Sequence, residues 1–384
     1  MGQLIAGPFA GCLLGYFGAE VIKIESPGNG DPLRQWRVVK DGTSLWWRSL
    51  ARNKKSVTIN LKTRQGRNIA KQLIEKSDVV IENFRPGTME KWGLGPEEFK
   101  QTHDQLIYAR ISGYGQTGPY ANRPGFASVC EGIGGLRYVN GFPGEAPVRP
   151  NLSLGDSLAG LHAAFGICLA LLQRNKPDSE GQVVDVALFE SVFNLLEAVV
   201  PEFDGAGIIR EPSGSTLTGI APTNTYRCED GKFVIIGGNG DSIFQRLMLA
   251  IGRDDLAQTE RLTTNLGRVA NEEELDEAIS DWTRTRPSDK VLRILTKADV
   301  PCGPIYSVAD ILNDKHFNAR DLFESVTING APLKIPAITP KLDGTPGRTE
   351  WPGGEIGAHT EDVLSNILGL NCQTIRTFRQ KGFI

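Results

Sequence analysis

Metal-ligand and disulfide patterns are absent from this sequence. Its six cysteines and four histidines stand singly along 384 residues, without a C-x-x-C pair or the close spacing of metal ligands. We therefore predict no bound metal and a reducing compartment. No secretory signal or membrane anchor is readable, so we expect a cytoplasmic protein, or a mitochondrial matrix protein if a targeting segment is missing from the sequence.

A large charge excess and a long apolar run are also lacking. The formal net charge is -3, which argues against a nucleic-acid partner. The longest apolar run, residues 158–172, includes His162 and is too short for a membrane span, so we expect a buried helix there and no membrane partner. The G-x-S-x-G motif of serine hydrolases and the P-loop of nucleoside triphosphatases are missing, which argues against both of these enzyme classes.

A dinucleotide-binding fingerprint is present only in part. Residues 113–118 fit G-x-G-x-x-G after a strand-like segment, but Pro119 and Pro124 follow where that fingerprint needs a helix. We interpret the segment as a glycine-rich loop and not as an NAD site.

The first half of the chain alternates strand and helix patterns. Strand-like segments lie at residues 21–24, 56–61, 78–82, 106–111 and 181–186, and helical spacing occurs at residues 8–17, 63–76 and 157–173. This alternation predicts an α/β fold with a Rossmann-like large domain built on a parallel sheet.

The second half predicts a smaller α/β domain. The stretch 204–225 is rich in Gly, Ser, Thr and Pro and indicates a linker after a large domain of residues 1–203. We expect the small domain over residues 226–322, and a tail over residues 323–384 that returns to the large domain.

Asp156 stands in Gly155-Asp156-Ser157, immediately before the apolar helix. This position is typical of an N-cap residue. The same position would let the helix dipole keep the carboxylate ionised as a nucleophile, with Gly155 and Gly160 leaving room for a bulky partner. Spacing alone does not decide between the two roles.

Several short motifs are spread over nearly the whole chain. They are Ala6-Gly7-Pro8-Phe9-Ala10-Gly11, Gly18 to Glu25, Arg52-Asn53-Lys54-Lys55-Ser56, Glu82 to Gly87, Gly113-Tyr114-Gly115-Gln116, Gly155-Asp156, Pro301-Cys302-Gly303-Pro304 and Gly357-Ala358-His359-Thr360. Taken together and in this order, they resemble the family III CoA-transferases, the group that includes formyl-CoA transferase and carnitine CoA-transferase. Their appearance is closest to the succinyl-CoA:dicarboxylate branch.

The resemblance implies covalent catalysis by Asp156 in an interlocked homodimer. The carboxylate would attack an acyl-CoA, with succinyl-CoA the expected donor, to give a mixed anhydride and a CoA thiolate. The thiolate would attack the aspartyl carbonyl, leaving an aspartyl-CoA thioester and releasing the first acid. The acceptor acid then reverses the steps. CoA enters as part of a substrate, and no tightly bound cofactor is implied.

The resemblance also assigns binding residues. Positions that match CoA contacts are Ala6, Arg34, Asn60, Leu61, Lys62, Asn83, Phe84, Arg85, Lys91, Gly125 and Phe126. A flexible flap that shields the site matches Gly237, Gly238, Asn239 and Gly240.

Two other functions are weighed against transfer. The related acyl-CoA racemases pair the aspartate with a histidine in a Gly-His-Asp segment, which here is Gly125-Phe126-Ala127. A racemase would therefore lack one of its two bases, and transfer is preferred. The third function is that of a non-catalytic acyl-CoA-binding homologue.

The stretch Pro147-Val148-Arg149-Pro150 resembles the approach to the aspartate in the dicarboxylate branch. A second carboxylate on the acceptor acid needs a cation, and arginine can hold it through two hydrogen bonds. Arg149, Arg137 and Arg123 are the candidates. The alternative is that Arg149 only fixes the loop before Asp156.

Family members normally begin with a strand ahead of the segment that matches residues 4–8. This sequence starts at Met1 without that strand. A misplaced start codon or a trimmed sequence would explain this difference. If the natural protein also starts here, we expect the central sheet to lose one strand, at a cost to stability and to some CoA contacts.

Overall fold

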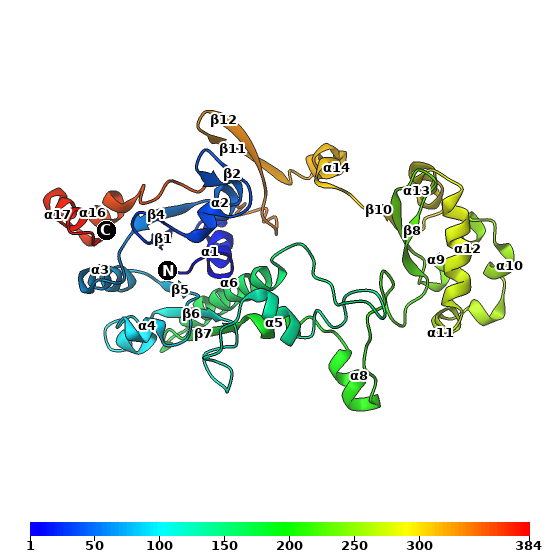
Figure 1. Ribbon diagram of the computed structural model, residues 1–384, viewed down its shortest axis with the longest axis horizontal. Coiled ribbons are helices and arrows are strands. Elements are labelled where there is room, and N and C mark those ends of the chain that lie inside the picture. The colour runs from blue at the N-terminus through cyan, green and yellow to red at the C-terminus, as the bar shows by residue number, and fades with distance from the viewer. The chain divides into compact units, whose positions relative to one another are not determined.

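The computed structural model describes residues 1–384 and divides into two compact units (Figure 1). The first comprises Met1–Leu136, Pro150–Glu197 and Asn318–Ile384, and the second comprises Arg137–Arg149 and Ala198–Phe317. These boundaries differ from the sequence-based ones in three places. Residues 137–149 belong to the second unit, and helix α8 (Val199–Ala206) lies where the end of the large domain and the start of the linker were expected. The returning tail begins at Asn318 and not at residue 323.

Five parallel strands organise the first unit, in two separate ladders. β1 (Val21–Glu25) pairs with β4 (Lys54–Thr58), and β5 (Val79–Glu82), β6 (Ile107–Ser112) and β7 (Val183–Ala187) pair in that order. β6 is buried at every position, as a parallel strand covered on both faces should be. The single sheet that the sequence predicts is therefore divided between β1 and β5.

Helices cover these ladders through apolar faces. α3 (Arg64–Ile74) begins where the Thr63 side chain accepts the Gly66 amide at 3.0 Å, and its buried residues cluster at helical spacing. The other helices of this unit are α1 (Ala6–Tyr16), α2 (Leu45–Leu50), α4 (Thr88–Lys91), α5 (Ala127–Ile133), α6 (Leu154–Arg174) and α7 (Leu188–Phe193).

The C-terminal segment packs against the edge of β4. The Ser56 amide donates to His359 Nδ1 at 3.1 Å, and the His359 amide donates to the Ser56 carbonyl at 2.9 Å. These bonds satisfy the outer edge of β4, where no further strand is present. The segment contains the hairpin β11 (Phe323–Ile328) and β12 (Ala331–Pro336) and the helices α16 (Thr360–Leu368) and α17 (Cys372–Gln380).

The second unit has its own core around a three-stranded antiparallel sheet. The order is β10 (Cys302–Pro304), β9 (Phe233–Gly237) and β8 (Thr223–Arg227). Phe244, Ile279 and Leu295 are among the side chains buried against it. The helices of this unit are α8, α9 (Asp241–Ala250), α10 (Asp254–Ala257), α11 (Asn265–Val269), α12 (Glu272–Arg284), α13 (Ser288–Lys297) and α14 (Val308–Asn313), with α15 (Lys315–Ala319) at the boundary.

Helix α6 differs from the buried helix that its sequence predicts. One side packs on α1, β6 and β7, but only 39% of the residues in its most apolar stretch are buried. The opposite side exposes Leu161, Phe165, Leu169 and Leu172. By length and composition alone this one helix would be able to cross a membrane, although its inner side contacts the sheet.

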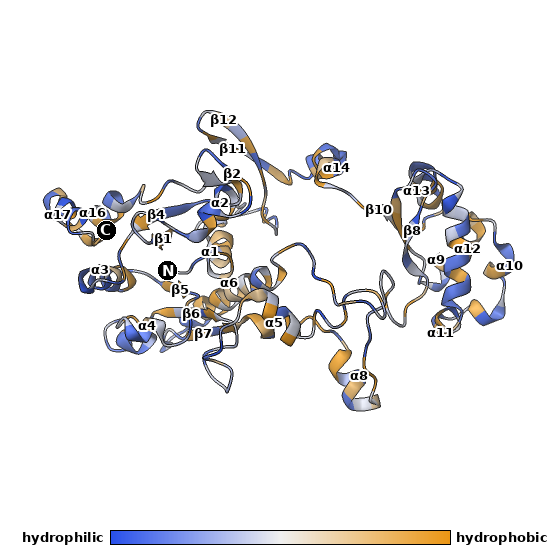
Figure 2. Cartoon of the chain, viewed as in Figure 1, coloured by the Kyte–Doolittle hydropathy of each residue, from blue (hydrophilic) through white to orange (hydrophobic).

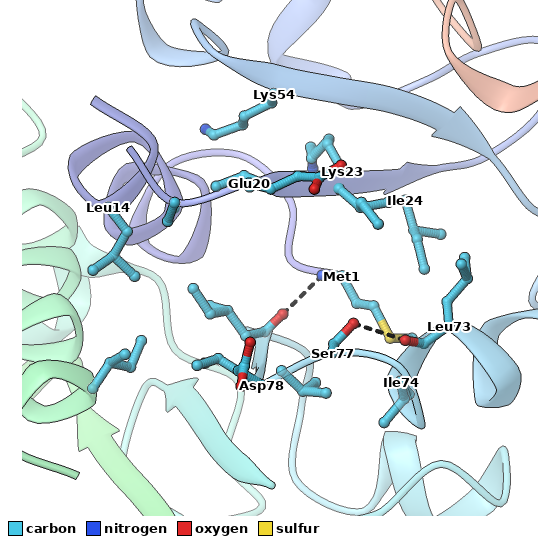
Figure 3. A pocket seen from close by; sticks show the side chains of 18 of the residues that line it. Met1, Leu14, Glu20, Lys23, Ile24, Lys54, Leu73, Ile74, Ser77 and Asp78 are labelled. Carbon is cyan, nitrogen blue, oxygen red and sulfur yellow. Dashed lines mark hydrogen bonds between the residues drawn. The ribbon is translucent and has the colours of Figure 1, made fainter. Parts of the chain in front are cut away.

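A cavity of about 460 Å³ separates the two ladders (Figure 3). Its lining includes the unpaired edges of β1 and β5, and Met1 lies inside it between the strand that carries Ile24 and the helix that carries Ile74. The terminal amine of Met1 donates to the Ile81 carbonyl at 2.8 Å. Burial, and next the charge of Lys23, lowers the pKa of this amine from 8.0 to about 5.

Candidate active site

Asp156 is the third residue of α6, inside the helix and not at its cap. Ser153 occupies the N-cap position, so the capping role that the sequence allowed for Asp156 is wrong. The carboxylate is partly buried and lies in the first turn, where the helix dipole favours the ionised form. An acid in this position is suited to act as a nucleophile.

The glycines near Asp156 serve the packing of the chain itself. A Cβ atom at Gly160 would lie 2.7 Å from the Ala6 carbonyl oxygen, and one at Gly155 would lie 3.3 Å from the Ala127 Cβ. Figure 1 shows α6 beside α1, and these two helices are in contact. The expectation that Gly155 and Gly160 leave room for a bulky ligand is therefore wrong, because α5 and α1 occupy that space.

The pKa of the Cys130 thiol, on α5, is affected by the nearby Asp156 carboxylate. Burial raises the pKa of its thiol most, and the carboxylates of Asp156 and Glu131 raise it further, to about 11. The thiol is protonated at neutral pH and is hydrogen-bonded to the Gly113 carbonyl at 3.3 Å. Cys130 is therefore not a competing nucleophile.

Three cations follow the carboxyl ends of parallel strands. Lys62 comes after β4, Arg85 comes after β5, and Lys91 ends the short helix α4. All three side chains are exposed and form no ion pair in the structure. Because ligands of open parallel sheets bind at this edge, these three residues are suited to hold phosphates.

Arg34, which the resemblance assigns to CoA, has partners within the chain. Its side chain is 2% exposed, donates through Nε and Nη2 to Glu25 at 2.8 Å each, and lies 3.8 Å from the centre of the Trp47 ring. Burial acts to raise the pKa of Glu25, but the hydrogen bonds and the charge of Arg34 hold it below its usual value. The contact of Arg34 with CoA stays a prediction.

The polar and apolar positions assigned to CoA also have contacts within the chain. Asn83 exchanges hydrogen bonds with the backbone of Gln3, and the Asn60 side chain donates to the Gly382 carbonyl at 3.0 Å. Phe84 packs edge-on against Trp92, and Leu61 and Ala6 are largely covered by the core. These residues shape the strand ends from which Lys62 and Arg85 project.

The glycine-rich loop after β6 packs against the segment that precedes α5. A Cβ at Gly113 would lie 3.2 Å from Gly125, and one at Gly125 would lie 2.9 Å from the Tyr114 ring, so both glycines are required by close approach. Phe126 is 74% exposed. An exposed aromatic side chain on this loop is available to a ligand.

The arginines assigned to the acid substrate fall in different units. Arg123 belongs to the first unit, is exposed and stacks on the Tyr120 ring at 3.6 Å. Arg137 and Arg149 belong to the second unit, whereas Asp156 belongs to the first.

The segment Gly237–Gly240 is more firmly held than a freely flexible flap. The Gly237 amide donates to Pro301 and the Gly238 amide donates to Pro222. A Cβ at Gly238 would lie 2.5 Å from the Leu247 side chain, so this glycine is needed for packing. Arg268, which the sequence analysis did not single out, donates to the Asn239 carbonyl at 2.8 Å.

Glu131 was also missed. It is a buried acid on α5, and its Oε1 accepts the Gly155 amide at 3.2 Å, one residue before Asp156. Its sequence signal is a single acid among the small and apolar residues of Ala127–Ile133. No group of three or more His, Cys, Asp or Glu side chains in residues 1–384 is arranged to hold a metal ion.

Comparison with known proteins identifies the family of this chain. The family model described as CoA-transferase family III matches residues 1–360. The chain belongs to CoA-transferase family III. It is 43% identical to the succinyl-CoA–D-citramalate CoA-transferase of Chloroflexus aurantiacus, with 100% of this chain and 96% of that protein covered.

Further relatives agree with this assignment. A succinyl-CoA–L-malate CoA-transferase alpha subunit of Chloroflexus aurantiacus is 40% identical over 100% of this chain and 90% of its own length. The crystal structure of a CAIB/BAIF family protein from Brucella suis superposes with a TM-score of 0.83 at 32% identity, covering 96% and 97% of the two chains. The family III CoA-transferase described here thus has a mixed α/β fold with parallel sheets. It is an enzyme that moves CoA between carboxylic acids, with CoA thioesters as substrates.

Proposed function

We propose that this enzyme transfers CoA from succinyl-CoA to a small dicarboxylic acid through an aspartyl-CoA thioester on Asp156. The observation that carries the proposal is the place of Asp156 in the first turn of α6, beside α5 and the loop that ends at Phe126. The helix dipole favours a negative charge at this position, and the thiol of the neighbouring Cys130 is protonated at neutral pH. The reacting anion of the site is then Asp156.

In this mechanism the Asp156 carboxylate attacks the thioester carbonyl and expels CoA as a thiolate. The C–S bond breaks as the anhydride C–O bond forms. The thiolate then attacks the Asp156 carbonyl, releasing succinate and leaving CoA on the enzyme as a thioester. The acceptor carboxylate attacks that thioester, and the same steps in reverse deliver the new acyl-CoA. Water must be kept out, because it would hydrolyse the anhydride, and we assign this shielding to Gly237–Gly240.

The donor and the acceptor follow from the relatives' names and from the arginines. The two named Chloroflexus relatives use succinyl-CoA with D-citramalate or L-malate, both of which are dicarboxylic acids. Incubation with succinyl-CoA and single acids, followed by mass spectrometry of the acyl-CoA products, tests the proposal. Citramalyl-, malyl- or glutaryl-CoA should form, and a failure of every dicarboxylate to yield its thioester would contradict it.

Arg149 is proposed to hold the distal carboxylate of the acceptor. Replacing it with methionine should lower kcat/KM for glutarate by about 100-fold or more and leave butyrate little changed, because only the diacid loses a paired charge. Steady-state kinetics with both acids measure this effect. Arg123→Met and Arg137→Met, which remove the other two candidate arginines, are measured beside it. If glutarate and butyrate are used equally by the unaltered enzyme, or if Arg149→Met keeps the full preference, the assignment is wrong.

We also propose an interlocked homodimer. The apolar side of α6 supports it, as does α8, which has no buried residue and exposes Val200 and Phe203 (Figure 2). Light scattering at micromolar concentration should give twice the mass of 41.8 kDa for the purified single chain. One relative is named as an alpha subunit, so assembly with a different chain is the alternative to a homodimer. A purified single chain that is monomeric would overturn the homodimer.

A further inference from the structure

The N-terminus of α6 is not capped by its own N-cap residue. The first amides of a helix have no partner within the helix and need an acceptor from elsewhere. Ser153 forms no side-chain bond to them. The Gly155 amide is instead accepted by Glu131 Oε1 at 3.2 Å, from a side chain that is 1% exposed.

The same helix, α5, contacts Gly155 at two points one turn apart. Ala127 and Glu131 are separated by four residues and therefore share one face of α5. A Cβ at Gly155 would lie 3.3 Å from both the Ala127 Cβ and the Glu131 Cγ. Gly155 is thus held by a hydrogen bond and by close packing, and no larger residue fits without a shift.

The start of α5 adjoins the loop that projects Phe126. Phe126 is the N-cap residue of α5. A Cβ atom added to the preceding Gly125 would lie 2.9 Å from the Tyr114 ring and 3.3 Å from Cys130 Sγ, so Gly125 is closely packed on both. Through α5 the position of this loop is linked to the position of Gly155.

We infer that Glu131 is a positioning residue of the transfer reaction, which fixes the Asp156 carboxylate by holding the Gly155 amide. The inference rests on the proposed role of Asp156 as the nucleophile. It assigns the effect to the acceptor oxygen of Glu131 and not to its charge. A displacement of a reacting group by about 1 Å lowers the rate of the chemical step by about 100-fold, while substrate binding elsewhere is unchanged.

The test compares two variants of nearly equal side-chain volume. Glu131→Gln keeps an acceptor oxygen, and kcat should stay within about threefold of the unaltered enzyme. Glu131→Leu has no acceptor, and kcat should fall by about 10- to 100-fold with KM for succinyl-CoA within about twofold. In single-turnover experiments the hydroxylamine-sensitive CoA adduct on Asp156 should form more slowly in the leucine variant by the same factor. Thermal unfolding confirms that both variants are folded.

If Glu131→Leu does not fold, Gly155→Ala replaces it, because its Cβ meets α5 at 3.3 Å. Its loss of kcat should be relieved by Ala127→Gly, which removes one of the opposing atoms. An adduct that forms at an unchanged rate in these variants would overturn the inference, as would equal losses for Gln and Leu. The absence of any adduct in the unaltered enzyme would instead overturn the proposed function.

Discussion

Replacing Asp156 with alanine is expected to abolish CoA transfer and leave the fold intact. Removal of a covalent nucleophile lowers kcat by at least about a thousandfold. The carboxylate contributes to stability mainly through the helix dipole, which is worth about 1 kcal/mol or less. Acyl-CoA product formation and thermal unfolding of the same preparation measure the two effects.

Asp156→Asn is the matched control for shape. Its amide has the size of the carboxylate but is a poor nucleophile, so transfer should be lost as it is with alanine. A soluble Asp156→Ala enzyme with normal turnover would contradict the mechanism.

Replacing Arg268 with methionine is expected to unfold the second unit at a much lower urea concentration. Arg268 is fully buried and donates to the carbonyls of Ala221, Leu262 and Asn239 and to the Asp241 carboxylate. Without the guanidinium these buried acceptors lose their donor, which should cost about 3 kcal/mol or more. Trp282 is the tryptophan of the second unit, so its fluorescence reports on this unfolding when the other tryptophans are replaced.

Asp241→Asn serves as the control for the ion pair. Its side chain is 70% exposed, and the loss of its charge should cost less than about 1 kcal/mol. If Arg268→Met is no less stable than Asp241→Asn, the guanidinium does not anchor the Gly237–Gly240 segment.

The sequence predicted the elements of the first unit well, because each has a strong local signal. The strand-like segments at 21–24 and 78–82 lie within one residue of β1 and β5, and the apolar run around residue 165 is the helix α6. The sequence correctly placed Asp156 near the start of that helix. It did not show that the helix begins after Ser153, which makes Asp156 the third helical residue. A boundary that varies by two residues decides between a cap and a first-turn carboxylate.

Tertiary pairing was beyond the reach of the sequence. The Arg34 side chain has the chemistry of a phosphate ligand, and only the fold shows that Glu25 and Trp47 already occupy it. The sequence overestimated the burial of α6, because a row of apolar residues gives the same sequence pattern whether it packs in the core or is exposed. Glu131 was missed because its role depends on the approach of α5 to Gly155.

The central claim is that CoA becomes covalently attached to Asp156 during turnover. The most direct measurement is mass spectrometry of the enzyme quenched during reaction with succinyl-CoA and then digested. We predict that the peptide containing Asp156 gains the mass of CoA minus water, and that hydroxylamine removes it. Turnover without this adduct, or with the adduct on a different residue, would contradict the account.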